Sequence, residues 1–330
     1  MSAEVAVAAM VLAGVVAYAV FGGADFGGGV WDLFASGPRR AEQRQAIARA
    51  MGPVWEANHV WLIFVIVLLA TAFPSGYASL TQALFVPFHL ALVGIVLRGT
   101  AFVFRAYGPH RDKFDRPTGA LFGASSAVTP VLLGMCLGAV SSGRIRLIDG
   151  RVIQSGVAWA SPMAVALGLF ALAICAYVAA VYLTLETSDA LREDFRNRAI
   201  ASGTVVVALS VAVLPIVRHE APAFWTRLLS ARSVPLFAAG VAAALTSGAA
   251  LRVRAYRVAR LATIVQVTCL LTGWGAANYP YLVAPDIDVH TAAAPAATLR
   301  FVLFAVPIGL CVLLPSLAYL FRVFKRSSVA

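Results

Sequence analysis

The sequence predicts an all-α, polytopic membrane protein with about nine transmembrane helices. Of its 330 residues, 61% are hydrophobic and only 12% are charged, and the mean hydropathy is +0.84. One soluble core of this size could not bury so much apolar surface. A lipid bilayer cannot satisfy the open edges of a sheet, so the spanning elements are expected to be helices.

Nine apolar runs approach or exceed the roughly 20 residues that a spanning helix needs. They cover residues 4–23, 56–73, 79–104, 118–140, 159–185, 200–217, 234–250, 260–280 and 299–321. The longest intervals outside them, 143–158 and 281–298, are too short to form a soluble domain. We therefore expect a single integral membrane domain over residues 1–330.

The basic residues of the short loops predict the orientation. Of the 26 lysines and arginines, 18 fall in loops on one side, seven on the other, and Arg98 lies within a run. Because such residues concentrate in cytoplasmic loops, the N-terminus is expected outside and the C-terminus in the cytoplasm. The net charge of +11 lies beside membrane spans, where anionic lipid accounts for it, so no nucleic-acid partner is expected.

The interval between the first two runs admits two interpretations. Residues 38–51 could form a short surface helix, with Ile47 and Met51 one turn apart on one face. A solvated connector fits the same composition.

The end of the first run holds an aspartate among glycines, in the stretch GGADFGGGVWD at residues 22–32. A phosphate-binding loop is not favoured, because no strand precedes the glycines. Gly23 and Gly27 form a GxxxG pattern, which lets a neighbouring helix approach closely. We expect these glycines to press that helix against Asp25.

Four ionisable residues fall within apolar runs or just beyond the end of one, where such groups are costly and often functional: Asp25, Glu56, Arg98 and His89. In the predicted topology Asp25 and Glu56 lie at similar depth near the cytoplasmic face. Arg98 lies seven residues before Arg105, or about 10 Å from that face. These groups could form a cluster that exchanges protons with water, and a buried ion pair or an interfacial helix cap fits equally well.

Two histidines are candidate haem ligands. His59 lies three residues after Glu56, on the same helical face, and His89 lies in the middle of the third run. A haem needs an axial side chain directed into a cavity. An isolated histidine in a span is more often a packed, hydrogen-bonded residue, so we expect no haem and no metal in this chain.

Two motifs give the chain a family resemblance. GGADFGGGVWDL at residues 22–33 and GPVWEANHVWLI at residues 52–63 resemble subunit II of the cytochrome bd type of quinol oxidase. The second motif has the form W, acid, x, N, H or Q, V, W. Supporting similarity occurs at Arg98 with Arg105, at TPVLLGMCLGAV and at YLTLETSDALREDFRNRA, so the resemblance covers most of the chain.

The resemblance implies a place in an aerobic respiratory chain of the bacterial cytoplasmic (inner) membrane. The partner would be a haem-bearing subunit I with two b-type haems and one haem d, which oxidises quinol at the outer face and reduces oxygen to water. Small single-span accessory subunits, lipid and quinone are further possible partners. This chain would have nine spans, bind no haem, and support a cytoplasmic proton path.

By position, Asp25 and Glu56 match the family's proton-path carboxylates, with Arg98 and His59 in supporting roles. The chain is short for the family, and Glu56 stands where many members carry aspartate. Two other classes of function fit the same acids. A proton-coupled secondary transporter would place them in broken helices at mid-membrane, and a structural scaffold would tolerate amides in their place.

Overall fold

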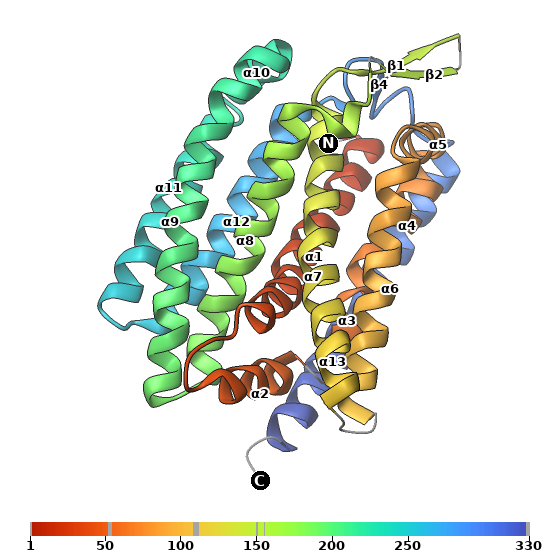
Figure 1. Ribbon diagram of the computed structural model, residues 1–330. Coiled ribbons are helices and arrows are strands. Elements are labelled where there is room, and N and C mark those ends of the chain that lie inside the picture. The colour runs from red at the N-terminus through yellow and green to blue at the C-terminus, as the bar shows by residue number, and fades with distance from the viewer. Residues whose placement is uncertain (1, 52–54, 108–111, 150, 155, 328–330) are drawn as a thin grey trace.

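The computed structural model describes residues 2–51, 55–107, 112–149, 151–154 and 156–327, and these form a bundle of long, roughly parallel helices (Figure 1). Among them, eight helices are long and apolar enough to cross a membrane. They are α1 (Ala3–Leu33), α6 (Phe85–Tyr107), α7 (Asp112–Ser141), α8 (Pro162–Glu186), α9 (Asp189–Glu220), α11 (Val234–Arg252), α12 (Tyr256–Asn278) and α13 (Ala296–Ser327). The expected all-α, polytopic architecture is therefore confirmed.

The second predicted span differs from the expectation of one long helix. It consists of α3 (Trp55–Asn58) and α4 (Val60–Ala72), which are interrupted at His59. With 13 residues, α4 is about 20 Å long, less than the thickness of the hydrocarbon core. This helix is therefore shorter than the sequence predicted, and it is not among the eight long apolar helices.

The third predicted span begins later than expected. Residues Pro74–Ala83 form a separate helix, α5, and α6 starts at Phe85 after a junction at Leu84. Pro74 occupies the first turn of α5, where its missing N–H costs no hydrogen bond. Figure 1 shows α5 almost end-on, across the end of α4, so residues 79–83 do not continue α6.

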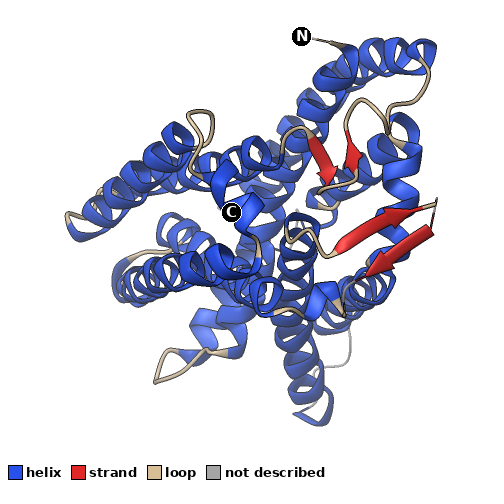
Figure 2. Ribbon diagram, turned by 90° about the horizontal axis from the view of Figure 1, so that it is seen from above, coloured by secondary structure: helices blue, strands red, loops and turns tan. Residues whose placement is uncertain are grey.

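The end of the bundle opposite α2 (Arg40–Met51) carries two small antiparallel sheets (Figure 1). One pairs β1 (Ile145–Ile148) with β2 (Arg151–Gln154), and the other pairs β3 (Tyr281–Val283) with β4 (Ile287–Asp288). Figure 2 shows both pairs above the helices. They occupy the two longest loops, outside the apolar helices, where strand edges can be hydrated.

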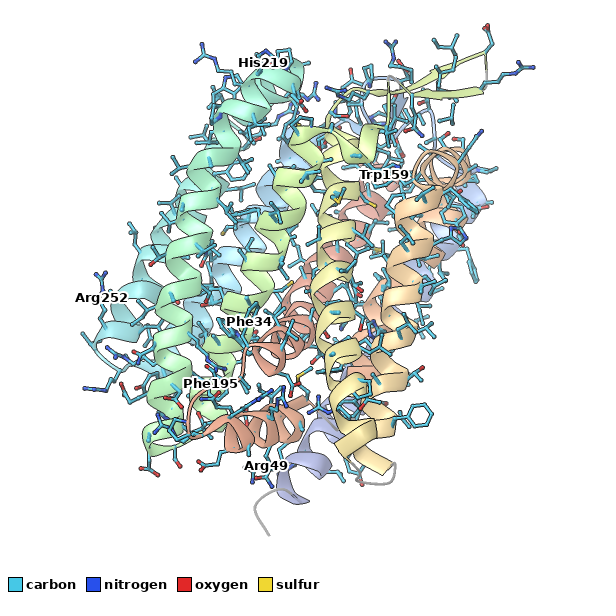
Figure 3. The ribbon with its side chains drawn as sticks, in the orientation of Figure 1. Phe34, Arg49, Trp159, Phe195, His219 and Arg252 are labelled. Atoms are coloured by element: carbon cyan, nitrogen blue, oxygen red, sulfur yellow. The ribbon has the colours of Figure 1, made fainter. Side chains whose placement is uncertain are left out.

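Short helices complete the ends of the bundle. The chain forms α2 at one end, with Ile47 and Met51 buried against other helices, so the predicted helix is confirmed over Arg40–Met51, and its apolar side faces protein. At the other end lie the 3-10 helix η1 (Ala158–Ala160) and α10 (Pro222–Leu228). Figure 3 labels Phe195 and His219 near opposite ends of α9, which extends over the length of the bundle.

Glycine allows α1 to pack closely against α8. A Cβ atom at Gly27 would overlap the backbone carbonyl of Cys175, whereas one at Gly23 would make an ordinary contact with the Cys175 Sγ at 3.5 Å. The predicted role of the GxxxG pattern is therefore confirmed at Gly27, while Gly23 has room for a methyl group. This contact fixes α8 beside the turn of α1 that carries Asp25.

Candidate functional site

Asp25 lies on α1 and is only 6% exposed. Its Oδ2 accepts a hydrogen bond of 2.5 Å from Nδ2 of Asn58, the last residue of α3. Asn58 is also buried, and its amide lies 3.5 Å from the Phe21 carbonyl oxygen. The interruption between α3 and α4 thus positions an amide donor against the carboxylate.

Arg98 on α6 is 1% exposed and lies in the same layer. Its Nε donates to the Ser126 Oγ at 3.1 Å, and its guanidinium carbon lies 5.1 Å from the centre of the Phe26 ring. The charges of Arg98 and Asp25 are close enough to interact electrostatically. Within the described part of the chain, however, neither residue forms an ion pair within 4.0 Å.

His59 and Tyr18 lie next to this polar layer, in the direction of the N-terminal part of α1. The Tyr18 hydroxyl lies 3.4 Å from Nδ1 of His59, and both rings contact the Phe26 ring, with centroids 6.3 and 6.2 Å from it. Tyr18 precedes Asp25 by seven residues, so it lies about 10 Å further along the same face of α1. The sequence analysis missed Tyr18, for which this seven-residue spacing was the available signal.

The backbone of Glu56 belongs to α3, and its side chain lies outside the residues whose side chains the structure describes. The predicted proximity of its carboxylate to Asp25 therefore stays a prediction.

Asp32 is a further acid of α1 that the sequence patterns did not single out, although it ends the same glycine-rich stretch. It is 1% exposed, and both carboxylate oxygens accept from Arg105, at 2.9 and 3.1 Å. Arg44 of α2 donates to the Asp32 backbone carbonyl at 3.3 Å. These bonds join α1, α2 and α6 at one end of the bundle.

His89 lies apart from this cluster. It is exposed on α6, and its Nδ1 lies 2.7 Å from the Phe85 carbonyl oxygen. Among the described residues, no group of three or more His, Cys, Asp or Glu side chains could hold a metal ion. The arrangement brings together Asp25, His59 and Tyr18, which can exchange protons, with Asn58 and Arg98, which supply a fixed amide and a fixed positive charge.

Comparison with known proteins shows a similarity over nearly the whole chain. A family model described as cytochrome bd terminal oxidase subunit II matches residues 3–324. A Bacillus subtilis (strain 168) protein, described as a candidate cytochrome bd menaquinol oxidase subunit II, is 23% identical over 94% of this chain and 92% of its own length. Subunit 2 of the cytochrome bd-I ubiquinol oxidase of Escherichia coli (strain K12) is 27% identical over 59% of this chain and 51% of its own length.

A solved structure shares the fold. A chain of the bd oxidase from Geobacillus thermodenitrificans superimposes with a TM-score of 0.83 at 22% identity, covering 98% of this chain and 99% of that chain.

Proposed function

Because the chain belongs to the cytochrome bd terminal oxidase subunit II family, we propose that it is the haem-free subunit of a quinol:oxygen oxidoreductase and contributes to its cytoplasmic proton path. One observation carries the proton-path proposal: Asp25 is buried and held by a neutral amide rather than by an arginine. A carboxylate in an ion pair keeps its charge, whereas one beside an amide can be either protonated or ionised.

The neighbouring groups have distinct roles in this proposal. Asn58 fixes the Asp25 carboxylate without exchanging a proton itself. Arg98, held by Ser126 and stacked on Phe26, supplies a fixed positive charge that stabilises negative charge in this apolar layer. Glu56 precedes Asn58 by two residues and is proposed as the second carboxylate of the path. His59 has a supporting role in the path through its contact with Tyr18.

The haem groups and the oxygen chemistry are assigned to a partner. We propose that subunit I carries two b-type haems and haem d and oxidises quinol, and that accessory subunits, lipid and quinone complete the assembly. The exposed position of His89 on α6 is an argument for a partner subunit at that surface, because an ionisable side chain in a span faces protein or water rather than lipid. The complex would reside in the bacterial inner membrane.

The expected orientation follows from the same proposal, with the N-terminus outside and the C-terminus in the cytoplasm. The observation that α1 begins at the strand-bearing end and α13 ends at the α2 end (Figure 1) supports nine crossings, with α4 as the short one. The proton-coupled transporter is not favoured, because the family match covers almost the whole chain.

The test is the pair Asp25→Asn and Glu56→Gln in the assembled oxidase. Amides keep the size of the side chain but cannot exchange protons near neutral pH. Quinol oxidase turnover is expected to fall at least about tenfold, which corresponds to roughly 1.4 kcal/mol of added barrier, with haem content unchanged.

Asp288→Asn at the opposite end serves as a control for the same chemical change, because the Asp288 carboxylate accepts local N–H bonds from His290 and Thr291 in the loop before α13. If Asp25→Asn lost haem and assembly but kept normal turnover per intact complex, Asp25 would be a structural residue.

A further inference from the structure

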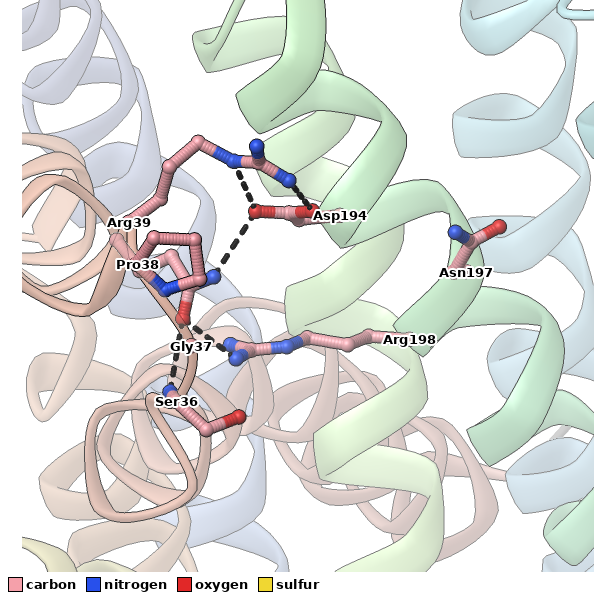
Figure 4. Close-up of a pocket in the computed structure, with 8 residues that line it drawn as sticks. Ser36, Gly37, Pro38, Arg39, Asp194, Asn197 and Arg198 are labelled. Atoms are coloured by element: carbon pink, nitrogen blue, oxygen red, sulfur yellow. Dashed lines mark hydrogen bonds and ion pairs between the residues drawn. The ribbon is translucent and has the colours of Figure 1, made fainter.

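A polar pocket of about 300 Å³ lies between the end of α1, α2 and the first turns of α9 (Figure 4). It is separate from the Asp25 cluster, and the proposed function does not use it. Its lining residues are Ser36, Gly37, Pro38, Arg39, Gln43, Asp194, Asn197 and Arg198.

The pocket contains one carboxylate, and that carboxylate is already satisfied. Both Asp194 oxygens accept from Arg39, with an Nε to Oδ2 distance of 2.8 Å, and Oδ2 also accepts from Gln43 Nε2 at 2.9 Å. With two arginines and one aspartate, the lining carries one net positive charge. That charge is located at Arg198.

The Arg198 side chain is held in one position by hydrogen bonds and ring contacts. Its Nη2 donates to Gln43 Oε1 at 2.6 Å and to the Phe34 carbonyl at 3.3 Å. Its guanidinium carbon lies 5.2 Å from the Trp31 ring and 5.4 Å from the Phe195 ring. An arginine fixed in this way loses little entropy when it binds an anion.

Both arginines keep N–H groups for a ligand. Among the described residues, the Nη1 group of Arg39 and the Nε group of Arg198 have no acceptor. Ser36 and Asn197 add a hydroxyl and an amide to the lining. Donors around a net positive charge are suited to a phosphate group.

The surface that leads away from the pocket is apolar. Asn197 is followed at helical spacing on α9 by exposed Ala201, Val205, Ala208 and Val211, with Val205 49% and Val211 62% exposed. Small alanines along this strip leave room for a hydrocarbon chain. A ligand with a charged head and an apolar tail fits both parts.

We propose that this pocket binds the phosphate of an anionic phospholipid, whose acyl chain lies along the exposed face of α9. The lipid would hold the α1–α2 loop against α9 at the membrane boundary. Arg198 and Arg39 bind the phosphate through their N–H groups, while Asp194 keeps Arg39 in position.

The experiment measures bound lipid on the assembled complex by native mass spectrometry, after reconstitution into vesicles of phosphatidylglycerol and phosphatidylethanolamine. Arg198→Gln is expected to lower phosphatidylglycerol retention about tenfold, as for the loss of one hydrogen bond to a charged group. Ser36→Phe should lower it similarly by filling the pocket without changing its charge. Ser36 is exposed, and its hydrogen bond to Gln43 comes from the backbone N–H, so this variant keeps the network intact.

Arg257→Gln is the matched control, because Arg257 is exposed at the start of α12 and does not line the pocket. Unchanged retention in both Arg198→Gln and Ser36→Phe would overturn the proposal, as would an equal loss in the Arg257 control. Displacement of the lipid by inorganic phosphate alone would also overturn it, because the pocket would then be a site for a free ion.

Discussion

At the scale of single residues, two aspartates on the same face of α1 have opposite surroundings. Asp32 makes two hydrogen bonds with Arg105, whereas Asp25 is bonded to the neutral amide of Asn58. Both carboxylates are buried. The ion pair joins two helices through Asp32, whereas Asp25 forms no ion pair within 4.0 Å among the described residues. Their amide variants should therefore fail in different ways.

The first prediction concerns Asp32→Asn. Removing one partner of a buried ion pair leaves the Arg105 charge uncompensated and destabilises by about 3–5 kcal/mol. We expect a lower yield and a lower midpoint of thermal unfolding, but normal turnover in the complexes that assemble. A well-assembled Asp32→Asn enzyme with reduced turnover would instead place Asp32 in the proton path.

The second prediction concerns Tyr18→Phe, which removes the hydroxyl facing His59 and keeps the ring contacts with Phe26. If protons continue from Asp25 along this face of α1, turnover should fall at least several-fold and at most by the roughly 10²–10⁴-fold typical of proton-transfer groups. Tyr177→Phe is the control, because its buried hydroxyl bonds to Ser247 away from the cluster. Equal turnover in both variants would exclude Tyr18 from the path.

The sequence identified Asp25, Arg98 and His59 because an ionisable group in an apolar run is conspicuous. It did not identify Tyr18 or Asn58 as members of the site. Neutral polar side chains cost less in a span than charged ones, so they are less conspicuous, although Tyr18 lies seven residues before Asp25 and Asn58 belongs to the second motif. Their roles depend on how α1 meets the α3–α4 interruption, which is a property of helix packing.

At the scale of elements, hydropathy predicted where most helices lie but not where they break. Residues 56–73 are apolar throughout, yet the helix is interrupted at His59, and the third run breaks at Leu84. Averaged hydropathy cannot detect a change of direction between two apolar segments. Pro74 was the local signal for α5, because proline favours the first turn of a helix.

The third prediction compares Gly27→Ala with Gly28→Ala, two identical changes at adjacent positions of α1. The added methyl group at Gly27 meets the Cys175 backbone, whereas at Gly28 it meets the flexible thioether of Met51. Overpacking against backbone costs about 1–3 kcal/mol, and a side chain can rotate away. Thermal stability should fall more for Gly27→Ala, and equal losses would contradict the close packing of α1 on α8.

The fourth prediction concerns the tether between the two small sheets. The Arg146 guanidinium, together with the Leu147 N–H, holds the pKa of Asp286 below its usual range. Because the pKa is lower in the folded state, this tether stabilises the folded protein above the ordinary pKa of about 3.9, and the contribution is lost as the pH falls through the folded value.

Asp286→Asn should speed hydrogen exchange in residues 145–154 at neutral pH. The variant should also lose the extra decrease in protection that the wild type shows as the pH falls. The change is measured by mass spectrometry after correction for the intrinsic exchange rate. Equal protection in the variant and the wild type would show that the tether does not hold the hairpin.

At the scale of the whole molecule, much apolar surface faces outward. On α13 the side chains of Phe301, Phe304, Ile308 and Val312 are 65–74% exposed. Their spacing of three or four residues places them on one face of the helix. Such a face is suited to lipid or to another membrane subunit, and it follows from the composition that predicted a membrane protein.

The fifth prediction is that the chain expressed without its partner contains no stoichiometric haem. His59 contacts Tyr18, and His89 faces outward from α6, so the two do not converge on a common cavity. The absorbance spectrum of the purified chain is the measurement. A haem band that persisted in the wild type and disappeared in His59→Gln or His89→Gln would assign a ligand to this chain.

The contact between α1 and α8 also constrains how the protein is made. Trp31 donates to the Ala176 carbonyl, 145 positions later in the chain. At about 5–20 residues per second, a ribosome needs roughly 7–30 s to synthesise that interval. During part of this time the buried acid Asp32 lacks Arg105, which follows it by 73 positions. We therefore expect the first helix to stay beside the insertion machinery, rather than in open lipid, until later helices cover its buried acids.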